Sequence, residues 1–395
     1  MVARHSSQNL AVGLASLLVL FMSSAYGYST TSTSGKAKSQ VSESAGAQKH
    51  ISHLRHHRRR HHYYERFYTS SFANDVTAGD VTDGEDLSVR AAAIDALGNM
   101  NGSVVAIDPA SGRILAMVNQ KLALSEGAQP CSTFKVAVAL AALKEGLITK
   151  DDEIRLGRRT RMNLTDALAH SNNAYFEALG RRLGFKRVSE YAHMFGMGEL
   201  AGYNIEGEHL GQFPAVAPGT KDGGVGKLCS YGETISMTPL QLGAMMVAVA
   251  NGGTLYFLQH PQSADEVTNF VPKVKRQLEI NDLIPDVSEG MAGAVAYGTA
   301  RSVRYNFDEE EILGKTGTCS KDGTRFGWFA SYANTDHGKV VIVVFLRGGR
   351  PTFGPKAAEI AGRMYHNLYS SNFFADTKPQ TPHQPATGVA VGISQ

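Results

Sequence analysis

The stretch QPCSTFKVAVALAALKEGL, residues Gln129–Leu147, carries the pattern on which the fold and the chemistry both depend. Pro130 ends one segment, and an apolar, alanine-rich run with helical periodicity follows. Ser132 and Lys135 lie three residues apart at the start of this run, and residues at that spacing share one face of a helix. The sequence therefore places a lysine amine beside a serine hydroxyl where a buried helix begins.

A serine hydroxyl is a weak nucleophile until a base takes its proton. A lysine can be that base when burial or a neighbouring cation lowers its pKa. The first turn of a helix also offers free N–H groups that can stabilise an oxyanion. The S-x-x-K pattern alone is weak evidence, because a capping serine followed by a solvated lysine has the same sequence.

Two further polar clusters follow in the chain. ALAHSNNAYFEALGRRLG, residues Ala167–Gly184, is a helical stretch with Ser171 and Asn173 near its start, which would also suit a helix cap. ILGKTGTC, residues Ile312–Cys319, is strand-like, and glycine in a strand often indicates close approach of a ligand to the backbone. The K-T-G-T motif of this strand-like stretch comprises Lys315, Thr316, Gly317 and Thr318.

The order S-x-x-K, S-x-N, K-T-G, each on the appropriate element, resembles the penicillin-binding transpeptidase and serine β-lactamase superfamily. The resemblance covers roughly residues 91–367. It extends to CSYGETISMTPLQLGAMMVAVANGG (Cys229–Gly253), GMAGAVAYGTAR (Gly290–Arg301) and GWFASY (Gly327–Tyr332). These segments look like the T-P-L-Q helix, the G-T-A segment and the W-F strand of the transpeptidases.

The resemblance implies a role for each matching residue. Ser132 would be the acylated nucleophile and Lys135 its base. Ser171 would relay the proton toward the leaving amine with Lys315 close by, and Asn173 would bind the substrate amide. The division of base and relay among Lys135, Ser171 and Lys315 stays open. The terminal carboxylate would be held by Lys315, Thr316 and Thr318 beside Gly317, and the oxyanion by the N–H groups of Ser132 and Thr318.

The branches of this superfamily differ in how they remove the acyl group. No E-x-x-L-N loop follows the second motif, as one β-lactamase branch would require. The class D-like branch has S-x-V and Y-G-N, whereas this chain has Asn173 and Tyr231-Gly232-Glu233. We therefore expect a D,D-transpeptidase or carboxypeptidase that acts on peptidoglycan stem peptides and takes β-lactams as covalent inhibitors. A serine β-lactamase and a non-catalytic β-lactam sensor are the alternatives.

Strands, a helical block and more strands indicate the α+β class. We expect one domain over residues 87–370 with the β-lactamase/transpeptidase-like fold. It would have an antiparallel sheet of about five strands, with terminal helices on one face and an all-helical subregion on the other. The predicted elements are a helix at 88–98, a hairpin at 102–120, helices over 131–200 broken at Gly146 and Gly180, strands at 312–320, 326–332 and 340–347, and a closing helix at 354–369.

Residues 1–27 resemble a targeting segment, with a weakly basic start, an apolar run at Leu10–Met22 and small residues after it. The run is short for a membrane span, which favours a cleaved signal peptide over an uncleaved anchor. In both cases the remaining chain would be exported, to the periplasm or the outer face of the cytoplasmic membrane.

Residues 28–86 have the composition of a disordered stalk, and 371–395 that of a disordered tail. The stalk contains six His and four Arg between His50 and His62. This stretch is either a solvated basic linker or, through His50–Arg60, a contact for an anionic envelope surface. The whole chain of 395 residues has a net charge of only +3, so we expect no nucleic-acid partner, and no feature implies a metal or organic cofactor.

The three cysteines, Cys131, Cys229 and Cys319, all lie next to motifs. An odd number without regular spacing is neither a disulfide framework nor a zinc pattern. Buried packing around the site is one interpretation. A disulfide between two of the three in an oxidising compartment is the other.

Overall fold

The computed structural model describes residues 66–335 and 338–376. The predicted targeting segment, the His/Arg-rich stretch up to residue 65 and the tail from residue 377 lie outside these residues. None of the described helices is both long and apolar enough to cross a membrane.

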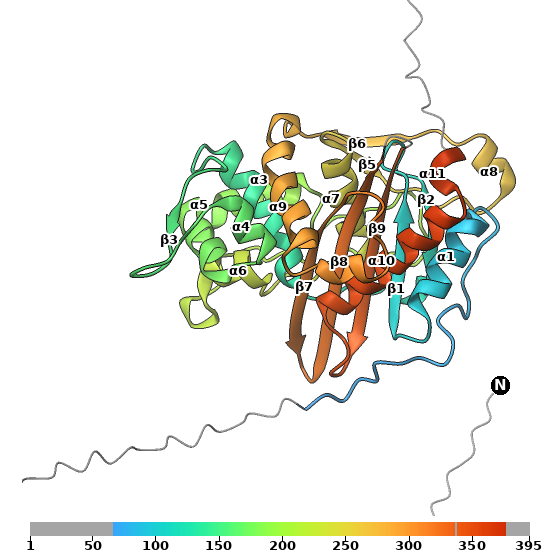
Figure 1. The fold of residues 1–395 in the computed structure, drawn as a ribbon, viewed down its shortest axis with the longest axis horizontal. Coiled ribbons are helices and arrows are strands. Elements are labelled where there is room, and N and C mark those ends of the chain that lie inside the picture. The colour runs from blue at the N-terminus through green and yellow to red at the C-terminus, as the bar shows by residue number, and fades with distance from the viewer. Residues whose placement is uncertain (1–65, 336–337, 377–395) are drawn as a thin grey trace, which may run out of the picture. The chain divides into compact units, whose positions relative to one another are not determined.

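A five-stranded antiparallel sheet, in the order β2-β1-β9-β8-β7, forms the centre of the domain (Figure 1). The hairpin expected near the N-terminus supplies two strands, and the three strand-like runs near the C-terminus supply the others. The α+β class and the five-stranded sheet are therefore confirmed. The strands are β1 (Gly102–Ile107), β2 (Ile114–Val118), β7 (Ile312–Lys321), β8 (Thr324–Thr335) and β9 (Gly338–Gly348).

Both faces of the sheet are buried, and the period-2 alternation of a strand divides its side chains between two cores. In β9, Val341, Val343 and Phe345 belong to the core under the helical block. Their neighbours Val340, Ile342, Val344 and Leu346 belong to the core on the other face. That second core is covered by α1 (Leu87–Leu97) and α10 (Gly354–Ser370), the two terminal helices that the sequence predicted there.

The helical block lies largely beyond the β7 edge of the sheet, as Figure 1 shows for α3, α4, α5 and α6. Helix α7 packs against β1, β8 and β9, and its first turn is closed by a capping box between Thr238 and Gln241. The helices of the block are α3 (Lys135–Lys144), α4 (Leu164–Ala169), α5 (Asn173–Met194), α6 (Gly224–Tyr231), α7 (Pro239–Ala250) and α9 (Ile284–Ala296).

The break in the long helix occurs at Gly184, where φ is +74°, and the expected break at Gly180 is wrong. Gly180 is instead a packing glycine, because an added Cβ would lie 2.6 Å from the sulfur of Cys229. Two further two-stranded sheets were not expected from the sequence. They pair β3 (Ile154–Arg155) with β4 (Arg161–Met162), and β5 (Thr254–Phe257) with β6 (Lys273–Gln277).

The expected start of order at residue 87 is also wrong, because residues 66–86 pack on the domain. Val76 is buried, and the backbone of this segment bonds to the loops after α1 and β7. Its buried carboxylates Asp80 and Glu85 each lie 2.8 Å from the guanidinium of Arg90 in α1. At the other end, α11 (Phe373–Asp376) continues beyond the predicted boundary at residue 370.

Arg90→Met leaves Asp80 and Glu85 as uncompensated buried charges, so we expect the free energy of unfolding to fall by about 3–5 kcal/mol. Arg304→Met is the matched control, since the Arg304–Asp308 pair is largely exposed and its loss should cost at most about 1 kcal/mol. Chemical denaturation of the two variants measures the difference. Equal losses would contradict the buried ion cluster.

Candidate active site

Ser132 lies in η1 (Cys131–Phe134), a short 3₁₀ turn that runs directly into α3. It is half-buried. Within the described part of the chain, neither its hydroxyl nor its amide N–H has a hydrogen-bond partner. Both groups are therefore available to a molecule that enters the site.

Lys135 is the first residue of α3, and its side chain is completely buried. Its Nζ lies 2.7 Å from the carbonyl oxygen of Ser171, 2.6 Å from Oδ1 of Asn173 and 3.1 Å from Oγ of Ser171. The first two motifs, which are 36 residues apart in the chain, thus meet at one amine.

Burial lowers the pKa of Lys135 to about 6, because an ammonium ion loses its hydration there. That value already includes a smaller lowering by the charge of Lys315 and an opposing contribution from the carboxylate of Glu177. No carboxylate forms an ion pair with this amine in the described residues. At neutral pH the amine is therefore mainly unprotonated.

A neutral amine has two hydrogens and one lone pair. The carbonyl oxygen of Ser171 and Oδ1 of Asn173 can only accept, so the two N–H groups of Lys135 donate to them. In the ammonium form Nζ also donates to Oγ of Ser171, at 3.1 Å. In the neutral form the lone pair is the group left to face this hydroxyl. The amine is thereby oriented so that its lone pair faces a hydroxyl group.

The turn between α4 and α5 explains why S-x-N suits this site. Ser171 adopts φ +54°, which directs both its carbonyl and its hydroxyl at Lys135. Asn172 caps α5 by accepting from the N–H of Tyr175 at 3.0 Å. Asn173, the first residue of α5, is left to face the amine.

The K-T-G motif lies on β7, the edge strand of the sheet. Lys315 is fully buried, its Nζ donates to the carbonyl of Thr316 at 3.0 Å, and burial lowers its pKa to about 7. Thr316 shares a 2.7 Å hydrogen bond with Thr299 of the G-T-A segment. Oγ1 of Thr318 accepts from the N–H of Gly354, where α10 begins.

Gly317 lets β7 approach the turn that holds Ser132. An added Cβ at Gly317 would lie 2.8 Å from the carbonyl oxygen of Pro130 and 3.3 Å from Cβ of Cys131. A side chain here would push the strand away from η1. The sequence suggested that glycine in this strand allows a ligand to approach the backbone. At Gly317 the group that approaches is the protein's own backbone at Pro130.

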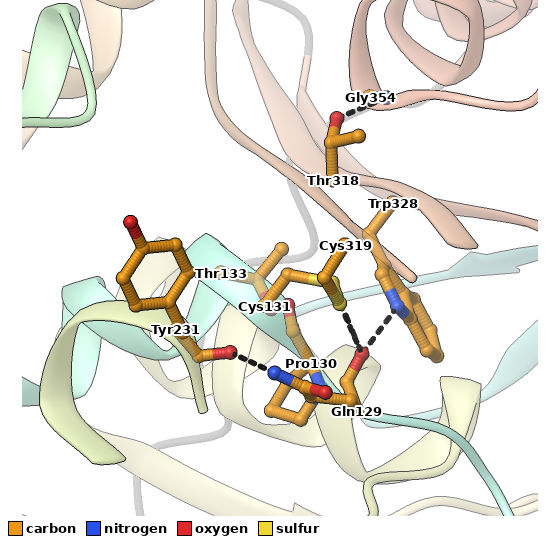
Figure 2. Close-up of a disulfide and its surroundings, with 9 residues drawn as sticks. All are labelled: Gln129, Pro130, Cys131, Thr133, Tyr231, Thr318, Cys319, Trp328 and Gly354. Atoms are coloured by element: carbon orange, nitrogen blue, oxygen red, sulfur yellow. Dashed lines mark hydrogen bonds between the residues drawn. A yellow bond between two sulfur atoms is a disulfide. The ribbon is translucent and has the colours of Figure 1, made fainter. Parts of the chain in front are cut away.

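The same approach is bridged by a disulfide between Cys131 and Cys319, with Cα atoms 5.7 Å apart (Figure 2). Beside it, the indole N–H of Trp328 donates to the carbonyl of Gln129 at 2.9 Å. The side-chain amide of Gln129 donates to the carbonyl of Tyr231 at 2.8 Å. Cys229 is buried with a free thiol, so the structure selects one of the pairings that the sequence left open.

The structure thus brings Lys135, Ser171 and Asn173 into direct contact, with Ser132 one helical turn before the amine and Lys315 near enough to shift its pKa. Sequence reasoning missed Thr299, Gln129 and Glu177. Thr299 lay in a segment already recognised by its G-T-A pattern. Gln129 contributes through its backbone carbonyl, for which no sequence signal exists.

Residues 102–366 match the family model described as the penicillin binding protein transpeptidase domain. This is about two thirds of the chain, and it includes all three motifs and every strand of the large sheet.

Curated relatives agree with this assignment. Stage V sporulation protein D of Bacillus subtilis is 26% identical over 312 residues, which cover 66% of this chain and 48% of that protein. The peptidoglycan D,D-transpeptidase MrdA of Acinetobacter baumannii is 23% identical over 378 residues, covering 76% and 54%. The chain therefore matches about half the length of these relatives.

Solved structures share the fold. The PBP2 structure from Pseudomonas aeruginosa superimposes with a TM-score of 0.60 at 22% identity, covering 73% of this chain and 74% of that one. The D,D-transpeptidase domain of a peptidoglycan glycosyltransferase from Eggerthella lenta gives 0.58 at 19% identity, covering 72% and 82%. With the motifs on the expected elements, the fold shared and the family model matched, the chain belongs to the penicillin-binding protein transpeptidase family.

Proposed function

We propose that this protein is a serine D,D-transpeptidase or D,D-carboxypeptidase that acts on peptidoglycan stem peptides ending in D-Ala-D-Ala. The buried, mainly neutral amine of Lys135 carries the proposal. A buried lysine without a carboxylate partner, held by two carbonyl groups one helical turn after Ser132, is a costly arrangement that suits a general base.

In the first step the hydroxyl oxygen of Ser132 attacks the carbonyl carbon of the penultimate D-Ala, and its proton passes to Lys135. The oxyanion is stabilised by the N–H groups of Ser132 and Thr318. The C–N bond then breaks, and the departing D-Ala amine receives the proton through Ser171. An ester between Ser132 and the shortened stem peptide remains.

The substrate is held by residues that do not react. Asn173 would bind its amide, and the cation of Lys315 with Thr316 and Thr318 would bind its terminal carboxylate. The buried Nζ of Lys315 donates to the backbone carbonyl of Thr316. A substrate carboxylate would give this amine a charged partner in place of that carbonyl. In the second step an amine of another stem peptide, or water, cleaves the ester.

Export of the protein is part of the proposal. The Cys131–Cys319 disulfide supports it, since disulfides persist in oxidising compartments outside the cytoplasm. The stem peptides of the cell wall are found in the same compartment. In that compartment the basic stretch His50–Arg60 would meet the anionic surface of the envelope, which would attract it.

A β-lactam that mimics D-Ala-D-Ala should acylate Ser132 and remain attached, because the ester has no dedicated base to activate water. Intact-mass spectrometry after mixing with a penicillin should show one adduct per chain that persists for many minutes. Ser132→Ala should show none.

Two other results have definite meanings. Rapid loss of the drug without an accumulated adduct would identify a β-lactamase and contradict the proposal. A persistent adduct without release of D-Ala from a pentapeptide, either with or without an added amine acceptor, would identify a sensor instead.

The rate of acylation should depend on pH through both lysines. It should rise through about pH 6 as Lys135 loses its proton and becomes a base. It should fall above about pH 7 as Lys315 loses the charge that binds the carboxylate. Stopped-flow measurement of penicillin acylation from pH 5 to 9 would show this narrow maximum.

A penicillin methyl ester is the matched control, because it has no carboxylate for Lys315 to bind. The alkaline decrease should disappear with the ester, while the increase near pH 6 should remain. An acid limb near pH 10 with either compound would show that Lys135 is protonated at neutral pH and would contradict its role.

A further inference from the structure

The Cys131–Cys319 disulfide occupies a particular place in the site, next to both groups that would bind the oxyanion. Cys131 directly precedes Ser132, and Cys319 directly follows Thr318. The bridge closes a ring through 188 residues of sequence separation, yet its Cα atoms are only 5.7 Å apart. The covalent bond therefore joins the residues directly adjacent to the two N–H donors, Ser132 and Thr318.

We propose that this disulfide positions the oxyanion-binding pair, by holding the amides of Ser132 and Thr318 at the separation that acylation needs. Cys131 and Cys319 would be positioning residues that touch no substrate atom. The proposal rests on the proposed function, since it assigns the bridge a part in the acylation of Ser132.

The first support is the strained backbone of the bridged turn. Cys131 adopts φ +54°, a left-handed conformation that is costly for any residue with a Cβ and persists only when surrounding contacts impose it. Within the turn, the N–H and the hydroxyl of Thr133 both donate to the carbonyl of Pro130. The N–H of Ser132 has no hydrogen-bond partner within the described residues, so its direction follows from the backbone conformation at Cys131, the residue that the disulfide anchors.

The second support is the edge position of β7, which pairs with β8 and with no other strand of the sheet. The free edge carries Thr318 and faces the helical block. Side chains alternate along the strand, so Gly317 and Cys319 both point toward the turn that contains Ser132. The disulfide is thus a covalent tie between η1 and an edge strand that is otherwise paired only with β8.

The third support is that two further contacts converge on the same three residues. The indole of Trp328 donates to the carbonyl of Gln129 (Figure 2). Gly317 packs against the carbonyl of Pro130. Trp328 lies directly opposite Gly317 in the β7–β8 ladder. Residues 129–131 are therefore held by the strand pair at three successive positions, and the last contact before the nucleophile is the covalent one.

The test compares Cys131→Ala, Cys319→Ala and the double variant with the wild type. Cys229→Ala is the control, since Cys229 is a buried free thiol outside the bridge. We expect the acylation rate constant for a penicillin to fall by about 10- to 100-fold in all three bridge variants. The dissociation constant of the non-covalent penicillin complex should change little, because the bridge touches no substrate atom. A bridge that only stabilised the fold would not lower the acylation rate constant while leaving this dissociation constant unchanged.

The double variant should be no slower than either single variant, because each single substitution already removes the bond. Reduction of the folded wild type with a phosphine should slow acylation to the same degree as the substitutions. The Cys229→Ala variant, which keeps the bridge, should be slowed by the phosphine as much as the wild type. If Cys131→Ala does not fold, Cys131→Gly removes the same bond at a residue whose φ suits glycine. Additive losses, or acylation at the wild-type rate, would overturn the proposal.

Hydrogen exchange decides the proposal even if the wild type is not acylated and the proposed function fails. Loss of the bridge should speed amide exchange in the peptides that contain Ser132 and Thr318, whereas Cys229→Ala should leave both unchanged. Unaltered exchange in the double variant would show that packing alone positions the two segments, and would overturn the positioning role.

Discussion

The burial of the Lys135 amine is the constraint on which the rest of the site depends. An ammonium ion with no carboxylate partner is unstable in a closed interior, so the fold favours the neutral form. A neutral lysine amine has two N–H donors and one lone pair. Two N–H groups serve the carbonyls of Ser171 and Asn173, and one lone pair faces a hydroxyl. The contacts that stabilise the buried amine therefore also fix its position beside the hydroxyl of Ser171, one helical turn after Ser132.

The sheet brings the other half of the site to this amine. Strand β7 is held by β8 on one side, while Gly317, Trp328 and the Cys131–Cys319 bridge hold it against the turn of Ser132 on the other. Lys315 is thereby placed near Lys135, and its charge lowers the pKa of the Lys135 amine. A substrate carboxylate would offset the charge of Lys315. Binding of the anionic terminus would therefore change the pKa of Lys135.

The three motifs, the sheet and its two covering layers could be predicted from the sequence because each leaves a local pattern. The corrections concern features without one. Residues 66–86 are polar enough to suggest a linker, yet Asp80 and Glu85 are buried because Arg90 meets them from another segment. The long helix breaks at Gly184, where φ is +74°, whereas Gly180 stays helical and packs against Cys229. The choice of Cys131 and Cys319 as the bridged pair required knowledge of the β7 approach. The carbonyl of Ser171 acts through backbone geometry that residue types do not encode.

The most direct test of this account is the titration of the Lys135 amine itself. NMR spectra of protein carrying ¹³Cε-labelled lysine, with Lys135→Met used to assign the signal, report the protonation of that side chain. The account predicts an inflection near pH 6 in the free protein, well below the ordinary lysine value of about 10.4. An inflection near the ordinary value would mean that the amine is a cation at neutral pH. In that case Lys135 could not accept the proton of Ser132, and the central claim would be wrong.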